Sequence, residues 1–158
     1  MNQYKLEAKW ALIFFAATLL WMLLERLAGL HDRYLNLHPY ISSLFIIPAV
    51  LIYVLALRKK KVQLGGAATY KQLFISGLMM TLAITAIAPF TQYVVSYWIT
   101  PDYFKNVIRY SVENGQMTQA EAENYFNYLS YVKQTVPFTF LAGVVTTALA
   151  SLFIRSRK

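Results

Sequence analysis

The sequence predicts an all-α integral membrane protein with four transmembrane helices and an extracytoplasmic amphipathic helical hairpin between the third and the fourth. Hydrophobic residues make up 58% of the 158 residues and charged residues only 14%, whereas soluble domains carry about 25% charge. The charged residues are also segregated, because long uncharged runs cover residues 34–57, 72–101 and 134–154. Each of these runs reaches the roughly 20 residues that a helix needs to cross a bilayer.

A chain of this length fits a single domain, here residues 1–158. A shorter uncharged run, Trp10 to Leu24, begins the first expected span. Glu25-Arg26 follows where a signal peptide would need small residues, so this span is expected to stay uncleaved. The expected spans cover residues 10–29, 40–57, 70–99 and 136–154, with the outer hairpin over residues 100–135.

The positions of the charges predict an orientation. With the loop Arg58-Lys59-Lys60-Lys61 inside, that side of the membrane holds ten cations and one acid, and the other side five cations and six acids. This asymmetry follows the positive-inside rule and places both termini in the cytoplasm. Topology and attraction to membrane lipids explain the net charge of +8, so no nucleic-acid partner is expected. The chain has no cysteine, which excludes disulfides and thiol catalysis.

The end of the first span places two charged residues at the membrane boundary. Arg26 can extend outward to phosphates, whereas the shorter Glu25 needs a hydrogen-bond donor from another helix. The candidate intramembrane polar site consists of Glu25, Arg26, Gln92 and Tyr93. In one interpretation Glu25 carries a proton beside Gln92 or Tyr93, and in the other it only locks the first span to the third.

The loop after the first span holds both histidines of the chain. His31, Asp32 and His38 have side chains that ligate metals, but such a loose spacing is common by chance. A polar turn is the favoured interpretation, so no metal site is predicted. Pro48, near the middle of the second span, predicts a kink.

Small residues recur at every fourth position of the third and fourth spans. The two rows are Gly77, Thr81 and Thr85 in the third span, and Gly143, Thr147 and Ser151 in the fourth. Small side chains let two helices approach closely, so the rows predict packing of the third span on the fourth. A polar path for a solute is the alternative use of the same residues. It is less favoured, because a threonine hydroxyl can bond to the backbone of its own helix.

Residues 100–135 form the expected hairpin. Thr100-Pro101 is typical of a helix start, Asn114-Gly115 of a stop, and Thr118 to Glu121 of a capping box that starts a second helix. The apolar residues on one side of these helices are Phe104, Val107, Ile108, Tyr125, Phe126 and Leu129. They bind a lipid or a protein partner in one interpretation and pack over the bundle in the other. Pro137 predicts a break or a kink where the hairpin enters the fourth span.

Short motifs along most of the chain resemble a known family. They are Leu24-Glu25, Gly29-Leu30-His31-Asp32, Ser76-Gly77, Pro89-Phe90-Thr91-Gln92-Tyr93, Ile99-Thr100-Pro101-Asp102-Tyr103-Phe104 and Gly115-Gln116-Met117-Thr118-Gln119-Ala120-Glu121. On these motifs the chain resembles the domain-of-unknown-function 4199 family of small membrane proteins. The resemblance implies four helices in the inner membrane of a bacterium, typically one of the Bacteroidota, and it implies no activity.

The sequence contains no recognisable catalytic arrangement, neither a nucleophile with its base nor a glycine-rich phosphate loop. Neither an enzyme nor a cofactor is therefore expected. In the first hypothesis, the protein is a scaffold or accessory subunit whose outer hairpin binds a lipid or a protein partner. The expected partners of the protein are membrane lipids and either another protein or, in a homo-oligomer, further copies of the chain. In the second, it is a small proton-coupled transporter that uses Glu25 with Thr85, Thr91 and Gln92.

Overall fold

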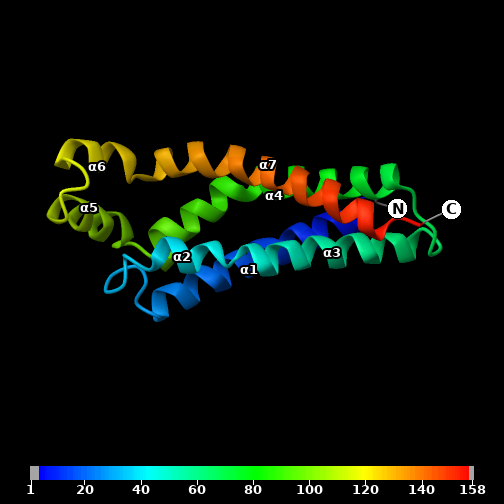
Figure 1. The fold of residues 1–158 in the computed structure, drawn as a ribbon, viewed down its shortest axis with the longest axis horizontal. Helices are drawn as coiled ribbons and strands as arrows, with labels where there is room; N and C mark the ends of the chain where they lie inside the picture. The colour runs from blue at the N-terminus through cyan, green and yellow to red at the C-terminus, as the bar shows by residue number, and fades with distance from the viewer. Residues whose placement is uncertain (1–3, 157–158) are drawn as a thin grey trace.

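The computed structural model describes residues 4–156, and within them the chain is helical. Its elements are α1 (Lys5–Leu27), α2 (His38–Ser43), α3 (Ile46–Gln63), α4 (Tyr70–Val94), the π-helix η1 (Val95–Ile99), α5 (Tyr103–Glu113), α6 (Gln119–Tyr125) and α7 (Tyr128–Ile154). Figure 1 shows an elongated bundle in which α1, α3, α4 and α7 run along the long axis. Residues 100–127, which contain α5 and α6, are called the cap. The cap lies at one end of the bundle, the cap end, and both termini lie at the other, the terminal end.

Four of the helical segments are long and apolar enough to cross a membrane. They are α1, α2 with α3, α4 with η1, and α7, of 23, 26, 30 and 27 residues. This result confirms the predicted number and order of the candidate spans. Their surfaces expose many large apolar side chains, among them Leu20, Ile46, Phe138 and Phe153. A soluble monomer rarely exposes large apolar patches, whereas a bilayer core accommodates them.

The second span is broken near its proline, as predicted. α2 ends at Ser43 and α3 begins at Ile46, so the break falls at Leu44 and Phe45. Pro48 has no N–H to donate to the carbonyl of Leu44, and its ring crowds that carbonyl. The helix therefore breaks just before the proline and not at it.

The most extensive packing between elements joins α4 to α7. Gly77 of α4 faces Thr147 of α7, and a Cβ added at Gly77 would lie 2.7 Å from the Thr147 hydroxyl. Gly143 of α7 faces Thr81 of α4 in the same way, with 2.8 Å from an added Cβ to the Thr81 hydroxyl. The small residues of the two predicted rows therefore lie against each other, as close helix packing requires.

The hydroxyls of these rows are buried between the helices. The Thr81 hydroxyl donates to the carbonyl of Gly77 at 2.9 Å and lies 2.9 Å from the Tyr53 hydroxyl. The hydroxyls of Thr85 and Ser151 are buried without a protein hydrogen-bond partner. These residues were expected either to pack two helices together or to line a polar path for a solute. Thr81 makes the bond to its own helix backbone that favours the packing role.

The fourth long helix begins earlier than predicted. α7 is continuous over Tyr128–Ile154 with Pro137 inside it, so the helix does not break at Pro137, and the kink that was the alternative there stays a prediction. Its start is set by Asn127, whose side chain accepts a hydrogen bond of 3.0 Å from the backbone N–H of Ser130. This N-cap satisfies a backbone N–H that the helix end would leave without a partner, whereas Pro137 removes a single hydrogen bond from a long helix. Leu129 consequently belongs to α7 and not to the cap.

Two of the three predicted signals for the ends of the cap helices are found in the structure. α5 ends at Asn114-Gly115, where Gly115 takes a φ of +64°. α6 begins with the predicted capping box, in which the side chains of Thr118 and Glu121 each accept from the other's backbone N–H. Thr100 does not start α5, because its N–H and its hydroxyl both bond back to the carbonyl of Val95 in η1. α5 therefore begins at Tyr103, three residues after Thr100.

A buried carboxylate joins three helices at the terminal end. Glu7 of α1 is 3% exposed and accepts hydrogen bonds from Lys60 of α3 at 2.8 Å and from Ser76 of α4 at 2.6 Å. Lys61 donates to the carbonyl of Ile154 at the end of α7. Two of the four consecutive cations near the end of α3 thus also fix the helices to one another.

Candidate functional site

Glu25 is buried although it lies in the last turns of α1. Glu25 is only 3% exposed, because residues 28–37 fold back over the end of the helix. Gly29 begins this return with a φ of +77°, a conformation that glycine adopts without strain. The return places His31, 5% exposed, next to the Glu25 carboxylate.

The Glu25 carboxylate has partners on both of its oxygens. Oε1 accepts hydrogen bonds from the Trp21 indole at 2.6 Å and from the Ser42 hydroxyl at 2.7 Å. Oε2 lies 3.2 Å from Nε2 of His31 and 3.6 Å from Nε2 of His38. Glu25, His31 and His38 are called the histidine–glutamate cluster. Through it, α1 is joined to the 28–37 loop and to α2.

Aromatic rings enclose the cluster on the side of the cap. The rings of His31, His38 and Tyr103 lie 4.9 to 5.3 Å apart, centroid to centroid. The Tyr103 hydroxyl lies 3.5 Å from Nδ1 of His38 and 3.2 Å from the Tyr131 hydroxyl of α7. Asn106 of α5 donates to the carbonyl of His31 at 3.1 Å. The cap is therefore fastened onto the loop that carries the histidines.

Tyr103 stays a neutral hydroxyl at physiological pH. Burial raises the pKa of Tyr103 above its usual value, and the negative charge of Glu25 raises it further, against the lowering effect of the Tyr131 hydrogen bond. A neutral phenol can donate one hydrogen bond and accept others. Tyr103 can therefore donate to His38 or to Tyr131 without adding charge to the cluster.

The structure brings together a different set of residues from the one expected around Glu25. Gln92 donates to the Ser96 hydroxyl at 2.9 Å, and the ring of Tyr93 packs on Tyr97 with centroids 4.9 Å apart. Neither contacts Glu25, whose hydrogen-bonding capacity is taken by other groups. The lock between the first and third spans comes instead from Arg26, whose guanidinium donates to the carbonyl of Ile99 in η1. Arg26 is nevertheless exposed, and its extension outward to phosphates stays a prediction.

The cluster can hold a metal ion or act as a hydrogen-bonded pin between elements. One ligand atom from each of its three residues lies within 4.8 Å of the others. Nε2 of His38 and Nδ1 of His31 are buried and have no hydrogen-bond partner in the protein. A small polar pocket of about 110 Å³ lies alongside, lined by Arg26, His31, Asp32, Thr100, Pro101, Asp102, Tyr103 and Asn106.

Comparison with known families adds the membership of the chain. Residues 9–156, nearly the whole sequence, match the family described as Protein of unknown function (DUF4199). The chain belongs to the DUF4199 family. This match confirms the resemblance seen in the motifs. Comparisons with curated proteins and with solved structures return no match.

Both histidines of this DUF4199 chain were visible in its sequence, but not their connection to Glu25. His31 and His38 follow Glu25 by 6 and 13 residues, across a turn that has no helical period. Asp32, which shares their loop, accepts a hydrogen bond from the N–H of Arg33 and takes no part in the cluster. The available signal was a carboxylate at the end of an apolar helix, followed at once by both histidines of the chain.

The predicted apolar face of the hairpin is divided between the inside and the outside of the protein. Val107 is buried, and the ring of Phe104 packs on Tyr131 with centroids 5.1 Å apart. Tyr125 and Leu129 are exposed, and Phe126 and Ile108 are half-buried. Packing over the bundle thus uses part of the face that had been considered for a partner.

Proposed function

We propose that this DUF4199 protein is a non-catalytic scaffold or accessory subunit of the bacterial inner membrane. Its four long helices cross the membrane, both termini lie in the cytoplasm, and α5 and α6 form an extracytoplasmic helical hairpin that binds a protein partner. The observation that carries the proposal is a groove on these two helices, called the partner groove. It is lined by Lys105, Ile108, Arg109, Val112, Glu113, Gln119 and Glu123.

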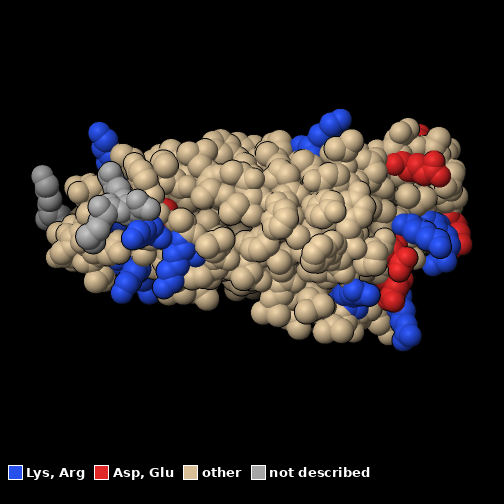
Figure 2. Space-filling view, turned by 180° about the vertical axis from the view of Figure 1, so that it is seen from behind, with Lys and Arg blue, Asp and Glu red and all other residues tan. Residues whose placement is uncertain are grey.

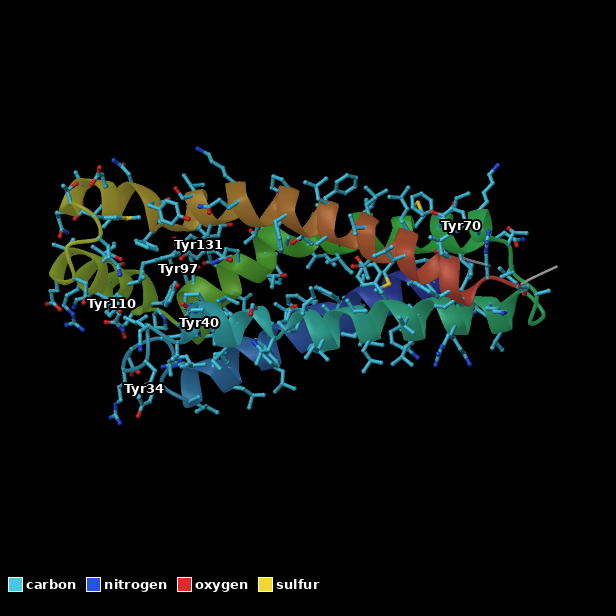
Figure 3. The ribbon with its side chains drawn as sticks, viewed as in Figure 1. Tyr34, Tyr40, Tyr70, Tyr97, Tyr110 and Tyr131 are labelled. Carbon is cyan, nitrogen blue, oxygen red and sulfur yellow. The ribbon has the colours of Figure 1, made fainter. Side chains whose placement is uncertain are left out.

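The distribution of charges and aromatic rings supports this orientation. On the face in Figure 2, Lys and Arg side chains gather at the terminal end, whereas most of the visible Asp and Glu side chains lie at the cap end together with further Lys and Arg, and a broad, mostly uncharged band separates the two ends. Cations favour the cytoplasmic side of a membrane. Tyr97 lies near the cap in Figure 3, next to Trp98, which is 73% exposed. Tyr and Trp rings are enriched at the membrane surface, so the cap stands just outside it.

The hairpin is held in place by the bundle. Its contacts with Tyr131 of α7 and with the backbone of His31 fix α5 from two directions. A surface fixed before binding loses less conformational entropy when a partner docks. The cap therefore suits recognition of a partner better than a loose amphipathic hairpin would.

The chemistry of the partner groove favours a protein over an anionic lipid. Ile108 and Val112 supply apolar surface, while Lys105 and Arg109 are balanced by Glu113 and Glu123. Binding of anionic headgroups depends on an excess of cations, which this groove lacks. Apolar surface rimmed by charges of both signs is typical of a protein interface.

The test compares two charge reversals in the full-length protein. Tagged protein is crosslinked in its native membrane, purified in mild detergent, and its partner is identified by mass spectrometry and co-expressed. Arg109→Glu lies in the partner groove, whereas Lys133→Glu reverses an exposed cation on α7 outside it. We expect the co-purified partner to fall about tenfold or more with Arg109→Glu, the loss of roughly 1.4 kcal/mol of binding free energy. We expect Lys133→Glu to retain it.

Three results of this experiment would contradict the proposal. They are equal retention of the partner by both variants, absence of any stoichiometric partner from the wild type, and recovery of a second copy of the chain alone. The last result would favour a homo-oligomer.

The transporter hypothesis is the weaker one on this structure. A hollow of about 120 Å³ between α1, α4 and α7 is lined in part by Thr91 and Gln92, as that hypothesis requires of a polar path. Ala11 and Ile84, which also line it, belong to a packed apolar cluster with Met80. This cluster lies along α1 between its two buried carboxylates and is largely apolar, and its Tyr53 hydroxyl already lies 2.9 Å from the Thr81 hydroxyl.

A further inference from the structure

We propose that Glu25, His31 and His38 bind a divalent first-row transition metal ion of the Zn²⁺ type at the cap end of the bundle. The site goes beyond the proposed binding of a partner, and it rests on different residues. Its ligand atoms are Oε2 of Glu25, Nε2 of His31 and Nε2 of His38.

The spacing of these atoms fits such an ion. Oε2 of Glu25 lies 3.2 Å from Nε2 of His31 and 3.6 Å from Nε2 of His38. Zinc binds imidazole nitrogen and carboxylate oxygen at about 2.0–2.2 Å in a tetrahedron, so two ligands of one ion lie about 3.3–3.5 Å apart. The distances from Glu25 to the two histidines therefore fit a zinc site, and ligand atoms from all three residues lie within 4.8 Å of one another.

The hydrogen bonds of the site direct the ligand atoms inward. Trp21 and Ser42 occupy Oε1 of Glu25, which leaves Oε2 facing the imidazoles. Tyr103 lies 3.5 Å from Nδ1 of His38, the nitrogen that does not face Glu25. Outer contacts of this kind hold the ligands of a metal in orientation.

An unpartnered nitrogen at the centre of the cluster supports a bound cation. Nε2 of His38 is buried and has no hydrogen-bond partner, although it lies close to the Glu25 carboxylate. Leaving a buried polar atom unsatisfied costs free energy, and a metal ion would use its lone pair. Because this nitrogen is buried, bulk solvent does not supply the missing hydrogen-bond partner.

The donor set selects the class of ion. Two neutral imidazoles and one carboxylate suit Zn²⁺ and its neighbours, whereas Mg²⁺ and Ca²⁺ prefer sites made of oxygen ligands. Three protein ligands leave a coordination position for water or another group. One carboxylate also offsets part of the charge of a divalent ion.

The test measures metal binding to the full-length protein in detergent. The protein carries a tag without histidines, is stripped with a chelator, and is titrated with Zn²⁺ and separately with Mg²⁺ by calorimetry, with bound metal counted by elemental analysis. We expect one Zn²⁺ per chain, no Mg²⁺ binding, and a rise in the melting temperature with Zn²⁺. We expect His38→Gln to lower the affinity at least tenfold, while Asp32→Asn, in the same loop but outside the cluster, keeps it.

A Co²⁺ titration of the folded protein gives a second readout that does not depend on stability. Tetrahedral Co²⁺ with two imidazole ligands absorbs in the visible range, and we expect this absorption in the wild type and in Asp32→Asn. Each variant is checked by circular dichroism and size-exclusion chromatography, and Glu25→Gln replaces His38→Gln if the latter does not fold. The proposal is overturned if the wild type binds no Zn²⁺, or if the folded cluster variant binds it as tightly as the wild type does.

Discussion

At the scale of the residue, two buried glutamates lie near the two ends of α1. Glu25 meets indole, hydroxyl and imidazole groups from its own helix, the 28–37 loop and α2, whereas Glu7 meets Lys60 and Ser76. A buried carboxylate is tolerated only where such groups satisfy it. Each glutamate therefore ties neighbouring elements to α1 at a fixed level of the bundle.

The pairing of Glu7 with Lys60 predicts a strong effect of removing one partner. Lys60→Met leaves the Glu7 carboxylate buried without its cation, and we expect a loss of about 3–5 kcal/mol in the free energy of unfolding. Unfolding in detergent by heat or denaturant measures this loss. Lys59→Met, an exposed neighbour, is the control and should change stability little.

The double variant Glu7→Gln with Lys60→Met separates the ion pair from general packing. Removing both charges should recover much of the loss, because no unpaired charge stays buried. A double variant as unstable as Lys60→Met alone would show that the pairing is not what stabilises this end.

The sequence showed that Glu25 needs partners but not which ones. A charge at the end of an apolar helix is visible from composition alone. The partners depend on how residues 28–37 return, which rests on one turn at Gly29 and on the packing of Leu30 and Leu35. No periodic pattern encodes such a turn. The three proposed metal ligands were not grouped together from the sequence for the same reason, because Asp32 was considered with the histidines in place of Glu25.

At the scale of the element, the contact of α4 with α7 depends on residues without bulk. The rows around Gly77 and Gly143 follow the helical period of four, which is why the sequence alone predicted this contact. The extra length of α7 was not predicted. By helix propensity, Pro137 is a stronger signal for a helix boundary than Asn127. The N-cap formed by Asn127 nevertheless determines where α7 begins.

The close approach at Gly77 predicts that a single added methyl group is harmful. Gly77→Ala places its Cβ against the side chain of Thr147, and we expect a loss of about 1–3 kcal/mol in stability, although alanine favours a helix more than glycine does. Thermal unfolding in detergent measures the loss. Adding Thr147→Ala should restore most of it by removing the clash, and failure of this rescue would argue against the packing described.

The N-cap of α7, formed by the Asn127 side chain, predicts a loss of stability when that side-chain amide is removed. Asn127→Ala loses the hydrogen bond to the N–H of Ser130, and we expect a destabilisation of about 1 kcal/mol. Asn124→Ala, on the exposed surface of the cap, serves as the matched control. Equal stability of the two variants in chemical denaturation would mean that Asn127 does not define the start of α7.

At the scale of the whole molecule, the order of the spans could be predicted because it depends on hydrophobicity and charge, which can be read directly from the sequence. Segregation of charge, lengths of apolar runs and the exposed apolar surface all lead to the same four segments. The position of the cap on the bundle could not be predicted, because it rests on contacts such as Tyr103 with Tyr131 between segments far apart in the chain. Both proposed sites, the partner groove and the metal site, lie at this end.

The orientation of the bundle is the claim on which the proposed function depends, and the lack of cysteine makes it directly measurable. Single cysteines are introduced as Gln116→Cys between α5 and α6 and as Ala67→Cys between α3 and α4, both at exposed positions. Intact spheroplasts are then treated with a maleimide that cannot cross membranes. The account predicts labelling of Gln116→Cys in intact spheroplasts and of Ala67→Cys only after the membrane is permeabilised. Labelling in the reverse order, or of both positions from outside, would contradict it.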